Sequence, residues 1–247
     1  MMDCSASAHQ ARCVALTQEH RGHGVSTAAY YLGRALVAQG LRVLLVDVTG
    51  RHQRISVLMA RGPVKNLVLW APALARPQDV APALDQARRQ TAGRADVIVL
   101  DIDAALLEHA GGFALGIEYV VAVTEQTEAG QESADHIAER LHDDEPPQSR
   151  VGVVFSRVDA AGGELPAQTA ARQLPVLGSY PADYLLASGE AYSLKGSDAA
   201  WPHDSYLYAL RRLGQQLKRI VPLCRTTGLV SMSRVLPHET NGHAKQR

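Results

Sequence analysis

Cysteine, net charge and long apolar runs are all scarce in this chain of 247 residues. Its three cysteines, Cys4, Cys13 and Cys224, show no Cys-x-x-Cys spacing, so we expect reduced thiols and neither a disulfide framework nor a zinc site. The formal net charge is zero, which gives no global attraction to nucleic acid or other polyanions. No apolar run is long enough to cross a bilayer, and the first residues lack the pattern of a secretory leader. We therefore expect a cytoplasmic protein.

The sequence does contain the pattern of an α/β protein. Apolar residues make up 46% of the chain and charged residues 20%, as in ordinary globular domains. Strand-like apolar runs alternate with helical patterns, which predicts a single doubly wound, mostly parallel sheet with helices on both faces. We expect this domain to occupy residues 12–223, after an N-terminal arm at 1–11 and before a disordered tail at 224–247.

A glycine-rich loop separates the first predicted strand, at 13–16, from the first predicted helix. It reads Gly22-His23-Gly24-Val25-Ser26-Thr27. The backbone N–H groups of such a loop approach a phosphate closely, and the helix N-terminus adds a favourable dipole. Ser26 stands where an Mg²⁺-ligating hydroxyl belongs, and Val25 stands where the phosphate-binding lysine belongs. We therefore predict weak binding of a nucleotide or phosphate-like anion, with hydrolysis weakened or lost.

Two later apolar runs each end in an acid. The run at 40–47 ends in Asp47, and the run at 95–101 ends in Asp101. The carboxyl ends of parallel strands meet at one edge of a sheet, where α/β proteins bind their ligands. Carboxylate and hydroxyl oxygens are the ligands that Mg²⁺ prefers. The sequence therefore predicts a metal site made of Ser26, Asp47 and Asp101.

From residue 13 to about 215, the order of these pieces resembles the MinD/ParA family of deviant Walker-A ATPases. The loop of that family reads Lys-Gly-Gly-x-Gly-Lys-Ser/Thr-Thr, and its two lysines fall on His20 and Val25. Its second acid, which is usually catalytic, falls on Thr49, and its adenine-binding Asn falls on Ser156. The resemblance implies ATP or ADP, with Mg²⁺, as the ligand. The implied nucleotide-binding positions are His20, Arg21, Gly22, Gly24, Val25, Ser26, Thr27 and Ser156.

The three departures from the family pattern, at Val25, Thr49 and Ser156, predict a pseudo-ATPase with negligible turnover. Altered loops of this kind are similar to those of the pilus-assembly CpaE/TadZ and cellulose-secretion BcsQ branches. The resemblance implies a positioning, assembly or regulatory factor that binds protein subunits of a pilus or a cellulose or exopolysaccharide secretion machine. It also implies recruitment to the inner membrane or a cell pole. The alternatives are a catalytic ATPase, a tyrosine autokinase of polysaccharide export and a DNA-partition ATPase.

The resemblance further implies a homodimer that forms through the face carrying the loop. At that face, apolar side chains replace or accompany positions that are usually more polar, namely Val25, Ile102, Ala104 and Ala105. An apolar surface costs less to desolvate than a charged one. We therefore expect these side chains to form part of the dimer interface, with less dependence on ATP than in other family members.

The last predicted element is an amphipathic helix at 206–221. One face collects the apolar residues Leu207, Leu210, Leu213, Leu217 and Ile220, which we expect to pack on the sheet. The other face carries Arg211, Arg212, Lys218 and Arg219, which we expect to lie in water. Contact of this helix with DNA or a membrane is the weaker alternative, because four basic residues give only a modest electrostatic attraction.

Overall fold

The computed structural model describes residues 10–20, 22, 24–49, 55, 64–74, 76–141, 150–158, 169, 173–181 and 206–221. The predicted N-terminal arm falls outside these residues apart from its last two, Gln10 and Ala11. The predicted tail at 224–247 lies wholly outside them, so both remain predictions.

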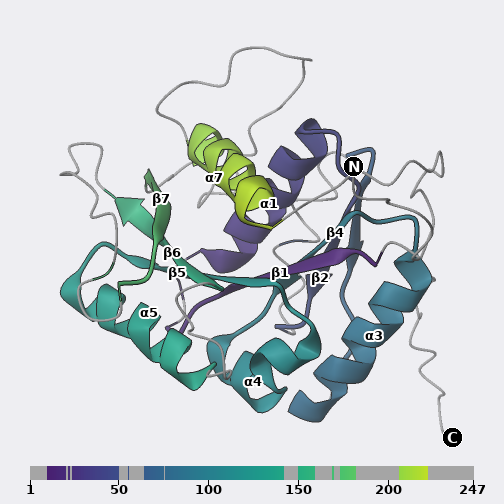
Figure 1. Cartoon of the computed structure of the whole chain (residues 1–247), viewed down its shortest axis with the longest axis horizontal. Helices are drawn as coiled ribbons and strands as arrows, with labels where there is room; N and C mark the ends of the chain where they lie inside the picture. Colours follow the sequence, from purple (N-terminus) through teal and green to yellow (C-terminus); the bar gives the residue numbers. More distant parts are fainter. Residues whose placement is uncertain are drawn as a thin grey trace, which may run out of the picture.

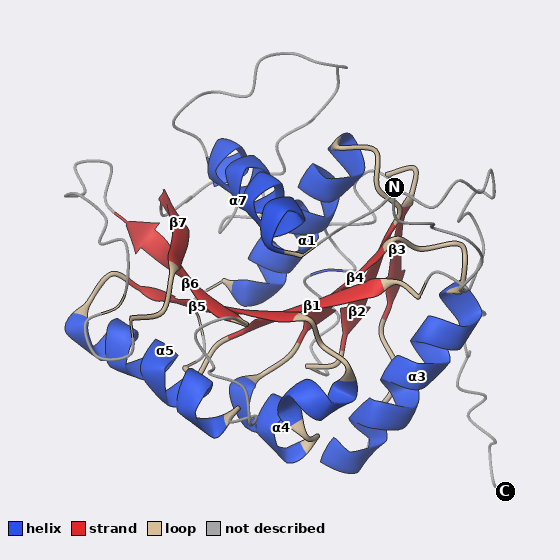
Figure 2. Cartoon of the chain, viewed as in Figure 1, coloured by secondary structure: helices blue, strands red, loops and turns tan. Residues whose placement is uncertain are grey.

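Within the described residues, seven strands form one sheet in which every pair is parallel (Figures 1 and 2). In chain order they are β1 (Arg12–Thr17), β2 (Val43–Asp47), β3 (Leu67–Trp70), β4 (Val97–Asp101), β5 (Tyr119–Glu125), β6 (Val151–Val158) and β7 (Val176–Pro181). Their order across the sheet is β3-β2-β4-β1-β5-β6-β7, which puts β1 at the centre. The apolar runs of β2 and β4 are buried along their whole length, as strands covered on both faces require.

Helices cover both faces of the sheet, which confirms the predicted fold class (Figure 1). One face carries α1 (Val25–Ala38) and α7 (Tyr206–Ile220). The other carries α3 (Val80–Thr91), α4 (Ala104–His109) and α5 (Glu128–Arg140). Two short 3₁₀ helices, η1 (Pro77–Asp79) and η2 (Gly112–Leu115), precede α3 and follow α4. No helix in the described part of the chain is long and apolar enough to span a bilayer.

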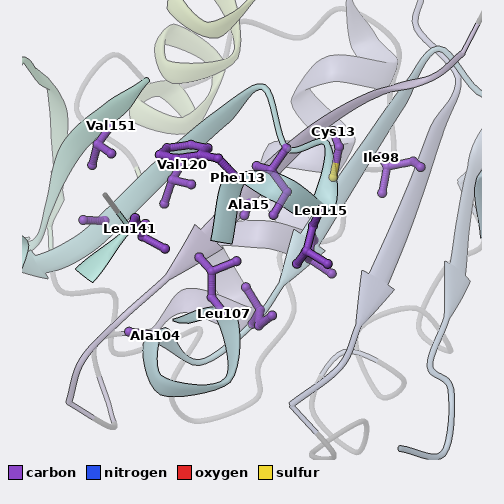
Figure 3. Packing of buried hydrophobic residues seen from close by; sticks show 14 of the residues in the cluster. Cys13, Ala15, Ile98, Ala104, Leu107, Phe113, Leu115, Val120, Leu141 and Val151 are labelled. Atoms are coloured by element: carbon purple, nitrogen blue, oxygen red, sulfur yellow. The ribbon is translucent and has the colours of Figure 1, made fainter. Parts of the chain in front are cut away.

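The core has one half on each face of the sheet. One half joins the sheet to α1 and α7, and the other joins it to α3, α4 and α5. Figure 3 shows part of the second half, where Leu107 of α4 and Phe113 of η2 gather with Ala15 and Val120 of the central strands. Cys13 belongs to this half, and its burial raises the pKa of the thiol to about 12. The Cys13 thiol is therefore protonated at neutral pH.

Among the strands and α-helices, β3, α3 and α4 were not predicted from the sequence. β3 has only four residues and lies at the edge of the sheet, where no long buried run is needed. α3 carries Pro82 in its first turn, a position where proline fits a helix but where its presence obscures the helical pattern. α4 has only six residues, too few for an apolar periodicity to be recognised.

The predicted amphipathic helix is confirmed as α7. Leu213 and Leu217 are buried in the core, whereas Ile220 is 42% exposed, so its assignment to the packed face was wrong. The four basic residues Arg211, Arg212, Lys218 and Arg219 are exposed, as expected. The side chains of Leu207 and Leu210, which were also assigned to the packed face, lie outside the described ones, so their packing stays a prediction.

A buried ion pair joins the segments that lead into β2 and β4, at the amino edge of the sheet. The Arg42 guanidinium donates to both carboxylate oxygens of Asp96, at 3.2 and 2.9 Å, and to the Gly93 carbonyl at 2.9 Å. The backbone adds reciprocal bonds, from Arg42 N–H to the Asp96 carboxylate and from Asp96 N–H to the Arg42 carbonyl, both at 2.8 Å. The side chain of Asp96 has no exposed surface. This pair therefore fixes the register in which the two strands start.

We expect Arg42→Met to lower the free energy of unfolding by about 3–5 kcal/mol, because it leaves the buried Asp96 carboxylate without its cation. Urea unfolding followed by circular dichroism measures this loss. The matched control is Arg76→Met, which removes the exposed pair of Arg76 with Asp79 at 3.2 Å and should change stability by less than about 1 kcal/mol. Equal effects of the two substitutions would contradict the structural role of the buried pair.

Candidate functional site

The loop between β1 and α1 lies at the carboxyl edge of the central strand. Gly22 and Gly24 adopt left-handed backbone with φ of 102° and 83°, a conformation that glycine enters without the clash of a Cβ. Gly24 caps α1, and its carbonyl accepts a hydrogen bond from Ala28 N–H at 2.9 Å. No side chain caps this end of the helix. The first-turn N–H groups of α1 therefore keep the capacity to bind an anion.

The two predicted metal-binding acids lie side by side at the same edge. Asp47 and Asp101 are the last residues of β2 and β4, and they face each other in the parallel register. Asp101 is also in register with Leu16 of β1, next to the start of the loop. Asp47 is fully buried and Asp101 is 1% exposed. The structure thus brings both carboxylates to the strand ends from which the loop departs.

Thr49, which stands in place of the family's second acid, is tied to the first. Its backbone N–H and its hydroxyl both donate to the Oδ1 atom of Asp47, at 3.0 and 2.7 Å. These two bonds orient the Asp47 carboxylate. A threonine hydroxyl has no basicity near neutral pH, so Thr49 positions Asp47 and offers no general base of its own.

Val25 is a core residue. Its side chain is 2% exposed and belongs to the cluster between the sheet and α1. Ile102 and Ala104, at 1% and 6% exposed, are likewise buried within the chain, whereas Ala105 is exposed. The expectation that these side chains form an apolar dimer surface is therefore wrong for Val25, Ile102 and Ala104. Sequence position correctly placed these residues at the edge of the sheet that carries the loop, but it did not indicate the direction in which their side chains point.

Three buried hydroxyls at or near this edge have no hydrogen-bond partner. They belong to Thr17 at the end of β1, Thr27 in the first turn of α1 and Ser156 in β6. All three residues are at most 5% exposed. A buried hydroxyl without a partner costs about 1–3 kcal/mol, so such groups in a native fold call for a ligand, an ion or a water. Thr17 was not among the predicted nucleotide-binding residues, although a polar residue that closes an apolar strand is a signal for it.

The remaining predicted residues are placed less closely together. His20 is exposed and Ser26 is partly exposed, both beside the loop glycines, while Arg21 lies outside the described residues. Ser156 sits two strands away from β1, in register with Glu125 of β5. Glu19, a further loop residue that the sequence did not single out, is ion-paired with α5.

The donor set fits an Mg²⁺ ion that arrives with a phosphate. Among the described residues, no group of three or more His, Cys, Asp or Glu side chains is arranged to hold a metal. Ser26, Asp47 and Asp101 supply one hydroxyl and two carboxylates, and Mg²⁺ commonly takes one or two carboxylates and completes its shell with phosphate oxygens and water. These residues would hold such an ion jointly with a ligand and not as an all-protein cage.

The fold of the chain is similar to several solved structures. MinD of Pyrococcus horikoshii, solved with Mg-ADP, aligns at 16% identity and a TM-score of 0.60 over 85% of this chain and 97% of its own. A putative plasmid partition protein of Borrelia burgdorferi, bound to AMPPNP, aligns at 15% identity and a TM-score of 0.58 over 85% and 99%. A chain of the MinC:MinD cell division protein complex of Aquifex aeolicus aligns at 18% identity and a TM-score of 0.57 over 85% and 96%.

The likeness is one of fold. At these identities it establishes a MinD/ParA-type P-loop architecture, in agreement with the single parallel sheet and its helices. No protein-family model matches the chain, and no curated protein matches its sequence.

We expect Val25→Ala to lower the free energy of unfolding by about 1–3 kcal/mol, because it removes two buried methyl groups from the core at the start of α1. Chemical denaturation with a fixed m-value measures the change. Ser26→Ala, one residue along and partly exposed, should shift stability by less than about 0.5 kcal/mol. A neutral Val25→Ala would mean that this side chain is not part of the core.

Proposed function

We propose that this chain binds a nucleotide weakly at the loop between β1 and α1 and does not turn it over. It acts as a cytoplasmic positioning, assembly or regulatory factor for an envelope secretion system. Binding of the nucleotide stabilises one conformation, in which a homodimer recruits protein subunits of a pilus or a cellulose or exopolysaccharide machine. The fold relatives solved with Mg-ADP and with AMPPNP support the choice of ligand, and the MinC:MinD complex supports a protein partner.

The observation that carries this proposal is the composition of the loop edge. Left-handed glycines, an uncapped helix N-terminus and the Thr17 and Thr27 hydroxyls without partners supply neutral donors for a phosphate. Asp47 and Asp101 supply oxygens for its Mg²⁺. The groups that would bind the phosphate are thus backbone N–H groups and hydroxyls, and these are present although the loop has no lysine.

The parts that accelerate phosphoryl transfer are changed. In place of a lysine, Val25 is packed into the core, where it offers no charge to a phosphate. In place of a second acid, Thr49 donates to Asp47. Catalysis of phosphoryl transfer depends almost entirely on positioned charges that stabilise the transition state. Removing such charges lowers the rate of phosphoryl transfer much more than it lowers the affinity for the nucleotide. The proposed function therefore depends on nucleotide binding and not on hydrolysis.

We expect calorimetry to detect binding of Mg-ADP and Mg-AMPPNP, and Gly24→Ala to weaken it at least about tenfold. A Cβ at the φ of 83° strains the loop backbone where the N–H groups must converge. Gly40→Ala is the matched control, because Gly40 has a φ of 86° at the other end of α1 and, like Gly24, has open space for a Cβ. The two variants should lose similar stability, and only Gly24→Ala should lose affinity. Absence of heat with both nucleotides would refute the proposal.

We expect ATP turnover to be at least about a thousandfold slower than in an ATPase with the lysine in place. Release of phosphate from ATP by the purified protein, with Asp101→Asn as its control, measures this rate. Wild type and Asp101→Asn should both remain at background. A sustained rate that disappears in Asp101→Asn would instead establish a working ATPase.

A further inference from the structure

Glu19 of the loop lies against two basic side chains from one face of α5. Arg140 Nη2 lies 3.2 Å from one carboxylate oxygen of Glu19, and His136 Nδ1 lies 3.9 Å from the other. His136 and Arg140 are four residues apart, so they project from the same side of the helix. The Glu19 side chain is only 15% exposed, which is low for a loop carboxylate.

α5 itself is firmly mounted on the sheet. Its Thr127 cap accepts from Gly130 N–H at 3.0 Å, and Thr124 of β5 donates to the Gly130 carbonyl at 3.0 Å. A Cβ on Gly130 would come within 2.1 Å of the Glu125 carbonyl oxygen, so the first turn lies directly on the end of β5. In the middle of the helix, buried Asp135 accepts from the Thr169 hydroxyl at 2.9 Å. The side chains of His136 and Arg140 therefore project from a helix that is fixed on the sheet.

We propose that Arg140 is a positioning residue of the loop, one that cancels the charge of Glu19 and so allows an anion to bind nearby. This inference rests on the proposed nucleotide binding. Glu19 lies three residues before Gly22 and five before Gly24 in the chain, so it belongs to the same loop as the N–H groups that would receive a phosphate. A like charge there opposes an anion, and a cation at 3.2 Å from that charge offsets the repulsion. α5 lies on the sheet face opposite to α1, so the Arg140 guanidinium reaches Glu19 from that opposite face (Figure 1).

The charge argument and a purely mechanical tether make opposite predictions. If Arg140 compensates a charge, Arg140→Met should weaken Mg-ADP binding between about three- and tenfold, the range expected for a partly exposed pair. Glu19→Gln should bind as tightly as wild type or more tightly, and Arg140→Met combined with Glu19→Gln should recover wild-type affinity within about twofold. If the pair were only a tether, both single variants would weaken binding equally and the double variant would not recover.

Arg12→Met is the matched control. It removes a pair of similar exposure, Arg12 with Glu118 at 3.4 Å, at the opposite edge of the sheet. It should leave Mg-ADP affinity unchanged within about twofold. The titrations should be repeated at higher salt, where the difference between Arg140→Met and wild type should shrink because the charges are screened.

Hydrogen exchange of the amides at residues 18–24, in the absence of Mg-ADP, tests the ion pair separately. Exchange should be faster in Arg140→Met than in wild type and Arg12→Met. Unchanged exchange would overturn the pairing of Glu19 with α5, whether or not nucleotide binds. Faster exchange with no loss of Mg-ADP affinity, or no recovery in the double variant, would overturn the charge compensation. If wild type binds no Mg-ADP, the proposed function and the charge compensation both fall, and only the pairing is left for hydrogen exchange to decide.

Discussion

The site depends on the parallel register of three neighbouring strands. β2, β4 and β1 end at the same edge, with Asp47 opposite Asp101 and Asp101 opposite Leu16. A shift of one residue would turn each end residue to the other face of the sheet, so the edge exists only in this register. At the amino edge, the buried pair of Arg42 and Asp96 fixes how β2 and β4 begin. A contact far from the loop thus determines which groups meet beside it.

The carboxyl edge could be predicted from the sequence because its signals are local. An apolar run that ends in an acid, or a run followed by paired glycines, indicates a strand end without knowledge of the rest of the fold, and Asp47, Asp101 and Gly24 were located in this way. The direction of a side chain at a helix start is not a local property, so Val25 was assigned to a surface although it lies in the core. Contacts between distant segments, such as Glu19 with Arg140, leave no pattern in either segment. Short elements such as β3 escape prediction for a different reason, because four residues are too few to display an apolar periodicity.

Groups of two kinds meet at the loop, and they respond differently to sequence change. The N–H groups of the loop and of the first turn of α1 belong to the backbone, so their position follows from the fold and the glycines. Charge belongs to side chains, and a single substitution removes it. A lysine introduced at residue 25 would meet a core already filled by neighbouring residues, because the valine is 2% exposed. Regaining a charge at this position would therefore require repacking around α1 as well as one changed codon.

α7 is part of the core as well as part of the surface. Gly214 lies so close to α1 that a Cβ there would be 3.0 Å from Gln39 Nε2 and 3.6 Å from Leu32 Cδ1. Leu217 and Val221 are buried in the same half of the core. A helix that lies in a lipid surface must turn its apolar side outward, and doing so here would uncover the top of α1. α7 is therefore held in place by the core, and Arg211, Arg212, Lys218 and Arg219 lie on the exposed side of a helix whose apolar side is already used.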